Sequence, residues 1–239
     1  MTHDETLRIG AAMRAARNLF AAPDETEHVF ELIRALEGKT MRHMCQRMRH
    51  SVEGRRLLRQ KPNILLQLCD RESLSALPEG SLGHAYLAFV DSEGIDADGL
   101  IEASEMHPID YDDADLQWAT DWLRDTHDLW HTVLGYQGDL VGEAALLAFS
   151  HEHIRNRGLA VIASLAWWKL GRVTDKSVEA RKTIVHGRRL AKETVWFVDV
   201  PWHEWLARPL EDVRRDLGVT SPVKYEAVRT EDVDTRLVA

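Results

Sequence analysis

Apolar residues recur every three to four positions along most of the chain, and this spacing constrains the fold more than any other feature of the sequence. Within residues 5–20, the apolar positions at helical spacing are Leu7, Ile9, Ala12, Met13, Ala16, Leu19 and Phe20. Alternating runs bounded by turn pairs, which indicate strands, are almost absent, and neither a GxGxxG nor a Walker-type loop occurs. The sequence therefore predicts an all-α fold.

Prolines and glycines divide this pattern into separate helices. Asp24 is a candidate N-cap, Pro201 and Pro209 suit the first turns of short helices, and Gly218 is a candidate stop. Residues 91–114 are rich in acids and glycines and predict an irregular connection. We expect helices at 5–20, 24–37, 40–49, 51–60, from about 81, 114–134, 139–156, 158–171 and 175–196.

The length of the chain, 239 residues, is enough for one helical domain with a sizeable core. We expect that domain at residues 26–220, after an N-terminal helical segment at 1–25 and before a loose polar tail at 221–239. Cys45 and Cys69 are too few for a disulfide framework and form no CxxC pair. They are interpreted as core thiols in a reducing compartment.

Charge and hydropathy exclude two classes of protein. The formal net charge of −9 argues against a general nucleic-acid binder, because phosphate backbones attract a basic surplus. The uncharged run from Gly158 to Trp168 is about half the roughly 20 residues that a membrane-spanning helix needs. The first ten residues are acidic and lack the apolar run of a signal peptide. We expect a cytoplasmic protein of bacterial type, with peripheral attachment to the inner face of the cytoplasmic membrane left open.

One segment, Asp125 to His131, concentrates side chains that bind metal ions. A helix turns about 100° per residue, so His131 lies roughly 40° and Asp128 roughly 100° from His127. The two imidazoles and the carboxylate therefore project into one arc, one turn apart. This is how a single helix can present three ligands to one ion.

A glycine turn follows, and it provides a candidate fourth ligand. Gly135 and Gly138 break the helix, Asp139 can cap the next one, and Glu143 lies one turn into it. A turn of this length would fold Glu143 back beside the histidines. Sets of histidine and carboxylate ligands suit zinc, iron, manganese or cobalt. The alternative is a hydrogen-bonded His–Asp–Glu network that joins two helices without a metal ion.

The spacing His127-Asp128-x-x-His131, eleven residues, then Glu143 resembles the HDxxH–x11–E signature of the coenzyme Q (ubiquinone) biosynthesis protein four family. The acidic pair usual in that family before the glutamate is reduced here to Asp139. The resemblance extends from about residue 29 to 220. The flanking matches are Arg124-Asp125, Gly135-Tyr136, Leu77-Pro-Glu-Gly-Ser-Leu-Gly83-x-Ala85-Tyr86, Val200-Pro-Trp-x-Glu-Trp205, Pro209-Leu and Val213-Arg-x-x-Leu217-Gly.

The resemblance implies a helical domain with a metal site between two long helices and an apolar cavity for a polyprenyl chain. His127, Asp128, His131 and Glu143 would be both the metal ligands and the catalytic residues. The implied reaction is oxidative removal of the ring carboxylate of a polyprenylated hydroxybenzoate, with hydroxylation at the same carbon. The implied partners are the prenylated quinone precursor, other ubiquinone-biosynthesis proteins and an anionic membrane surface. We also expect a homo-oligomer.

Other readings of the same residues are weaker. A phosphohydrolase of the HD type would need a further upstream histidine and a downstream aspartate on suitable helices. A di-iron bundle needs two Glu-x-x-His pairs, and only Glu25-x-x-His28 is present. The stronger rival is a non-enzymatic scaffold that binds quinone precursors and uses the metal ion structurally.

Overall fold

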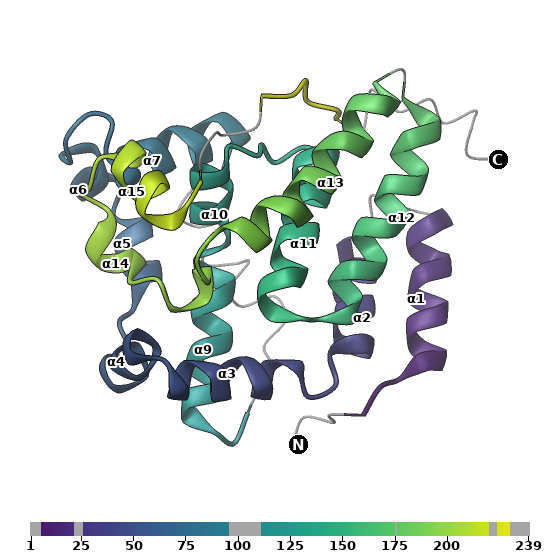
Figure 1. The fold of residues 1–239 in the computed structure, drawn as a ribbon, viewed down its shortest axis with the longest axis horizontal. Coiled ribbons are helices and arrows are strands. Elements are labelled where there is room, and N and C mark those ends of the chain that lie inside the picture. The colour runs from purple at the N-terminus through teal and green to yellow at the C-terminus, as the bar shows by residue number, and fades with distance from the viewer. Residues whose placement is uncertain (1–5, 22–25, 96–110, 175, 220–223, 230–239) are drawn as a thin grey trace. The chain divides into compact units, whose positions relative to one another are not determined.

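The computed structural model describes residues 6–21, 26–95, 111–174, 176–219 and 224–229. Within these ranges the chain forms helices (Figure 1). One isolated antiparallel bridge joins Ser81 and Pro209. The predicted all-α fold is confirmed. None of the described helices is both long enough and apolar enough to span a bilayer.

Contacts between residues divide the chain into two compact units, each built from separate stretches of sequence. Among the described residues, the first unit contains 42–95, 111–137 and 194–219, and the second contains 6–21, 26–41, 138–174, 176–193 and 224–229. The division expected at residues 25 and 220 and the apolar lipid cavity stay predictions.

Short, individually capped helices make up the first unit. In α4, α5, α6, α7 and α9 the N-cap side chain accepts a backbone N–H, as Ser51 does from Gly54 and Asn63 does from Leu66. Two of these helices, α5 and α6, are missing from the sequence prediction because they are too short to show an apolar period. The helices are α3 (Thr40–His50), α4 (Val52–Gln60), α5 (Ile64–Cys69), α6 (Arg71–Ser75), α7 (Leu82–Glu93), α9 (Ala114–Asp125), α10 (His127–Leu134), the 3-10 turn η1 (Phe197–Asp199), α14 (Trp202–Trp205) and α15 (Leu210–Leu217).

The single helix predicted at 114–134 is wrong, because the structure breaks it at Thr126. This residue ends α9 and begins α10, with φ −92° and ψ 0°. Its hydroxyl donates to the Trp122 carbonyl at 2.8 Å. The same hydroxyl contact occurs inside continuous helices at Thr120 and Thr132, so it does not by itself account for the break. The candidate metal ligands of this segment therefore lie on an eight-residue helix.

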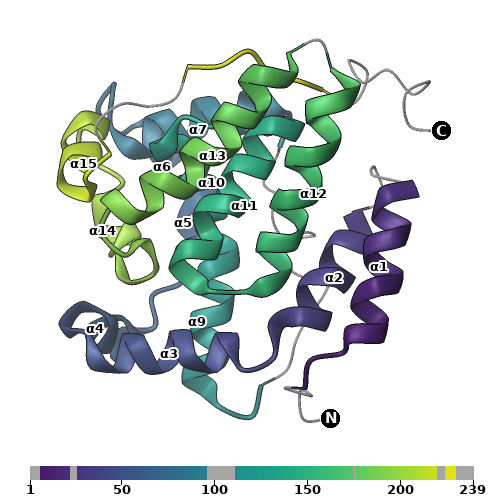
Figure 2. The same ribbon diagram turned by 45° about the vertical axis from the view of Figure 1, so that its right-hand side comes forward.

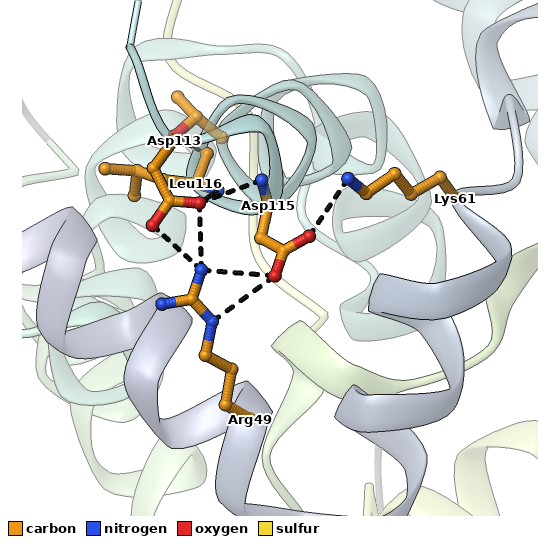
Figure 3. Close-up of polar contacts among 6 residues, drawn as sticks. Arg49, Lys61, Asp113, Asp115 and Leu116 are labelled. Atoms are coloured by element: carbon orange, nitrogen blue, oxygen red, sulfur yellow. Dashed lines mark hydrogen bonds and ion pairs between the residues drawn. The ribbon is translucent and has the colours of Figure 1, made fainter.

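Ion pairs fix the start of α9 against α3 and the end of α4 (Figure 3). The Arg49 guanidinium donates to both oxygens of Asp113 at 2.8 Å and to Asp115 at 3.1 Å. Lys61 Nζ lies 2.9 Å from the other oxygen of Asp115. Asp113 also caps α9 by accepting the N–H groups of Asp115 and Leu116. These contacts position the helix that leads directly into α10.

Longer helices make up the second unit, where α11, α12 and α13 pack against one another and α2 packs against α1 and α12 (Figures 1 and 2). The backbones of α11 and α13 lie in close contact at Gly187. A Cβ at this position of α13 would lie 2.3 Å from the Ala145 carbonyl oxygen of α11. Alanine, valine and leucine fill the surrounding core. The helices are α1 (Ile9–Ala21), α2 (Thr26–Glu37), α11 (Leu140–Ile154), α12 (Arg157–Val173) and α13 (Ser177–Glu193).

The segment 224–229 is attached to the second unit, and over these residues the predicted loose tail is wrong. Val228 is fully buried, its N–H donates to Asp139 at 2.9 Å, and its carbonyl accepts from Leu140 N–H at 3.0 Å. The Tyr225 hydroxyl donates to the other oxygen of Asp139. The segment has few large side chains. It is held by the Asp139 carboxylate, which accepts from Val228 N–H and the Tyr225 hydroxyl, and by the backbone bond from Leu140 to Val228.

Both cysteines are free thiols, as expected, although only Cys45 is buried and Cys69 is partly exposed. Burial raises the pKa of the Cys45 thiol, which keeps it protonated and unreactive. The predicted N-cap Asp24 and most of the connection expected at 91–114 lie outside the described residues.

Candidate metal centre

Helix α10 brings together three of the four predicted ligands. His127, Asp128 and His131 each offer one ligand atom, and these three atoms all lie within 4.8 Å of one another. The histidines are one turn apart with their ring centroids 4.8 Å apart, and Asp128 lies beside the first. The arc predicted from helical spacing is therefore present, and this cluster could hold a metal ion.

His131 is the buried member of the cluster, with 1% of its surface exposed. Its Nδ1 lies 3.1 Å from the carbonyl oxygen of Tyr136. Since a carbonyl can only accept, Nδ1 carries the proton and Nε2 carries the lone pair. Metal-binding histidines are usually held this way, with one ring nitrogen donating to a carbonyl and the other free for the ion. The chemistry of the donor set fits a divalent metal ion.

The turn after α10 makes this contact possible. Gly135 adopts φ 75°, a left-handed conformation that glycine reaches without strain, and its N–H closes the helix on the His131 carbonyl at 2.8 Å. The chain then reverses, so that the Tyr136 carbonyl faces the His131 ring. Arg214 of α15 donates to the carbonyls of Thr132 and Val133, at 3.1 and 2.9 Å. These bonds give the last carbonyl groups of α10 hydrogen-bond partners and tie the end of the helix to α15.

The cluster runs from the interior of the first unit toward its surface. Phe89 of α7 stacks on the His131 ring with centroids 5.3 Å apart and an interplanar angle of 16°. The side chain of His127 is 42% exposed and that of Asp128 is 19% exposed. Nδ1 of His127 lies 3.1 Å from Oδ1 of Asp128. One candidate ligand is therefore buried, while the other two lie where a bound molecule could reach them.

Glu143, the fourth predicted ligand, lies on α11 and belongs to the second unit. Its side chain is partly buried, and its N–H closes the first turn of α11 on the Asp139 carbonyl at 2.8 Å. The boundary between the units falls between Gln137 and Gly138, so the place of Glu143 beside the histidines stays a prediction. Asp139 caps α11 and binds the 224–229 segment with both carboxylate oxygens.

Three groups at the site are absent from the sequence prediction. They are the Tyr136 carbonyl, the Phe89 ring and the Arg214 guanidinium. Two flanking matches of the signature contain two of them, Gly135-Tyr136 and Val213-Arg-x-x-Leu217-Gly, although neither match indicated a contact with His131 or α10. Phe89 lies 42 positions before His131 in the sequence and belongs to none of the matched segments.

Asp125 shows how burial alters the ionisation of an acid next to the cluster. Burial raises the pKa of this carboxyl, and the adjacent Arg124, which donates to it at 2.9 Å, partly opposes the rise. Asp125 is therefore paired, and the arginine rather than a metal ion compensates its charge.

Comparison with known proteins identifies the family of the chain. The family model described as coenzyme Q (ubiquinone) biosynthesis protein Coq4 matches residues 3–223. The relatives include the ubiquinone biosynthesis proteins of Neurospora crassa, which is 31% identical over 74% of this chain and 49% of its own, and of Podospora anserina, 30% identical over 76% and 58%. The mouse protein is 28% identical over 78% of this chain and 68% of its own. The chain thus spans about half to two thirds of the length of these relatives.

A solved structure shares the fold. The crystal structure of a candidate ubiquinone biosynthesis protein from Nostoc punctiforme superposes with a TM-score of 0.68 over 90% of this chain and 100% of that one. The two sequences are 20% identical, so this likeness supports the helical fold alone.

These comparisons correct one prediction. The relatives from Neurospora, Podospora and mouse are all named as mitochondrial proteins, which contradicts the expected cytoplasmic location. All three are named as ubiquinone biosynthesis proteins. With a family match over residues 3–223 and the HDxxH segment on α10, the chain belongs to the coenzyme Q (ubiquinone) biosynthesis protein Coq4 family.

Proposed function

We propose that this protein carries out a metal-dependent oxidative decarboxylation in ubiquinone biosynthesis. The substrate would be a polyprenylated hydroxybenzoate, whose carboxylate at ring carbon C1 is replaced by a hydroxyl group. The observation that carries the proposal is the cluster on α10, in which the Tyr136 carbonyl orients the buried His131 ring as a metal ligand. The family match supports the pathway, ubiquinone biosynthesis, and the His127, Asp128 and His131 cluster supports a metal-dependent reaction.

The overall change can be balanced without assigning its steps. The ring carboxylate leaves as CO2, a water-derived or oxygen-derived hydroxyl replaces it, and two electrons pass to an oxidant such as dioxygen. His127, Asp128 and His131, with Glu143 as the predicted fourth ligand, would hold the ion. A bound ion would withdraw charge from a carboxylate or phenolate oxygen, and iron, manganese or cobalt could also exchange electrons, which zinc cannot.

The protein's own side chains would position and protect the reacting group. The Phe89 ring covers one face of His131 and excludes water from it. Asp128, which is partly exposed and next to His127, is a candidate to accept or return a proton, and Glu143 is the other. The first unit would thus provide both a buried metal ligand, His131, and a partly exposed acid–base group, Asp128.

The partners follow from the same proposal. A prenylated precursor would bind in an apolar cavity, other ubiquinone-biosynthesis proteins would bind the chain, and the chain would form a homo-oligomer. An anionic membrane surface would suit α12, where Trp167 and Trp168 are 39% and 40% exposed. The guanidinium of Arg181 lies 4.7 Å from the Trp167 ring and that of Arg172 lies 4.0 Å from Trp168. Paired aromatic and basic side chains are typical of lipid headgroup contacts.

The test is rescue of cells that lack their own member of the family. We would compare the unaltered chain with His131→Ala and with His151→Ala, a matched change of another helical histidine. We expect the unaltered chain and His151→Ala to restore ubiquinone. Cells that carry His131→Ala should accumulate a ring-carboxylated prenyl intermediate, which mass spectrometry would detect. If folded His131→Ala also restores ubiquinone, the protein is a non-catalytic scaffold.

Metal titration separates the metal centre from a purely hydrogen-bonded network. The 3.1 Å contact between His127 and Asp128 would occur in either arrangement. A network predicts no stoichiometric binding of zinc or cobalt, whereas a metal centre predicts one ion per chain that His131→Ala removes.

A further inference from the structure

Helix α7 contributes a buried tyrosine hydroxyl to the first unit. Tyr86 is 0% exposed, and its hydroxyl oxygen forms no hydrogen bond with any of the described residues. A buried hydroxyl without a partner destabilises the folded state, so such groups are rare unless something else binds them. The feature requires an explanation that core packing does not provide, because phenylalanine would fill the same space.

The position of Tyr86 on α7 points to the candidate metal centre. Tyr86 and Phe89 are three residues apart, so they lie on the same face of this helix. Phe89 stacks on the His131 ring, and α7 packs against α10. The face that carries the Tyr86 hydroxyl is therefore the face turned toward the helix of the cluster.

The charges around Tyr86 determine what its hydroxyl can do. Burial raises the pKa of the phenol above its usual range, and the neighbouring charge of Asp128 raises it further. Cys69 and Asp125 act in the same direction, while Arg71 opposes them. The hydroxyl therefore stays protonated and is available as a hydrogen-bond donor to an acceptor oxygen.

We propose that Tyr86 donates a hydrogen bond to an oxygen of the molecule bound at the cluster formed by His127, Asp128 and His131. The acceptor would be a carboxylate or phenolate oxygen, a class that follows from the proposed function and on which this inference rests. Tyr86 would orient that oxygen and would not hold the metal ion. Its loss should therefore weaken binding of an oxyanion and leave metal affinity intact.

The experiment uses the full chain loaded with Co²⁺ and the variant Tyr86→Phe. The probe is 4-hydroxybenzoate, titrated while the visible absorption of the bound cobalt is recorded. We expect about tenfold weaker binding of the probe to Tyr86→Phe, the size of one hydrogen bond to a charged group. Cobalt affinity should be unchanged, and the melting temperature should be unchanged or higher.

A second probe tests whether the effect is specific. Imidazole can bind the metal ion through nitrogen and offers no oxygen to Tyr86, so both proteins should bind it equally. Equal 4-hydroxybenzoate affinities in the two proteins would overturn the role of Tyr86. A parallel loss for imidazole would also overturn it, because that result indicates altered access. If the unaltered chain binds no cobalt, the metal-dependent function and the role of Tyr86 both fail.

Discussion

Helices α10 and α11 end in the same way, but only one of them carries a candidate site. In α10, Nδ1 of His131 lies 3.1 Å from the Tyr136 carbonyl, and in α11, Nδ1 of His151 lies 2.8 Å from the Asn156 carbonyl. The C-cap of each helix is left-handed, at Gly135 with φ 75° and at Arg155 with φ 67°, and its N–H donates to the histidine carbonyl.

The positions one turn earlier distinguish the two ends. His131 is preceded by His127 and Asp128, whereas the corresponding residues before His151 are Leu147 and Ala148. A histidine that donates to a carbonyl five residues later is thus a local helix-end arrangement in this protein. It becomes a candidate ligand in α10 only because two other ligand-type side chains lie on the same face. His151 supplies a control with the same local geometry.

The largest expected effect tests this comparison directly. His131→Ala should reduce the affinity for Zn²⁺ or Co²⁺ by at least about 100-fold, since it removes a buried ligand. His151→Ala should leave that affinity unchanged within about threefold, because the positions one turn before it are Leu147 and Ala148, which cannot bind a metal ion. Competition with a chromophoric chelator measures both values, and circular dichroism checks that both variants fold. Equal losses in the two variants would contradict the assignment of the site to α10.

The next effect concerns how closely α11 packs against α13. Gly187 of α13 lies so close to the Ala145 carbonyl that a Cβ would approach it to 2.3 Å. Gly187→Ala should therefore lower the free energy of unfolding by about 2 kcal/mol, measured by urea denaturation. The matched change Gly10→Ala in α1 would meet only Arg14 Nη1 at 3.9 Å, and should be neutral or stabilising by up to about 1 kcal/mol. Similar stabilities for the two variants would show that α11 and α13 are less closely packed.

The smallest effect concerns the ion pairs that position α9 and, through it, α10. The hydrogen bond from Arg49 lowers the pKa of Asp113, and Lys61, aided by Arg49, lowers that of Asp115 despite some burial. Because the folded pKa values lie below the unfolded ones, this stabilisation is present above the unfolded pKa and is lost as the pH falls through the folded values. The side chains are about a third exposed, so solvent limits the contribution to about 1 kcal/mol.

Arg49→Gln should remove most of this pH dependence. Its unfolding free energy should lie about 1 kcal/mol below that of the unaltered chain near pH 6, and the difference should shrink toward about pH 3. Arg59→Gln on α4 is the matched arginine change and should show no such pH-dependent difference. If the difference in unfolding free energy between the unaltered chain and Arg49→Gln grew as the pH fell, the ion pairs of Arg49 with Asp113 and Asp115 would be contradicted.

Local patterns in the sequence predicted much of this molecule. Apolar spacing predicted the all-α fold and most helices, because each helix buries one face wherever it packs. The spacing of His127, Asp128 and His131 predicted a shared arc, since all three lie on one helix and helical geometry alone determines their directions. The break at Thr126 escaped prediction, because the apolar period continues through it and Thr120 and Thr132 make the same hydroxyl contact without ending a helix.

Only the tertiary structure decided which distant groups complete the site. Phe89 and Arg214 come from α7 and α15, and no periodicity relates them to α10. The same holds for the 224–229 segment, whose polar composition predicts a loose tail although Asp139 binds its backbone. The sequence by itself determined the directions of side chains within one helix. Contacts between helices depend on how side chains from distant parts of the sequence pack and form hydrogen bonds together. The pattern of a single segment therefore cannot predict them.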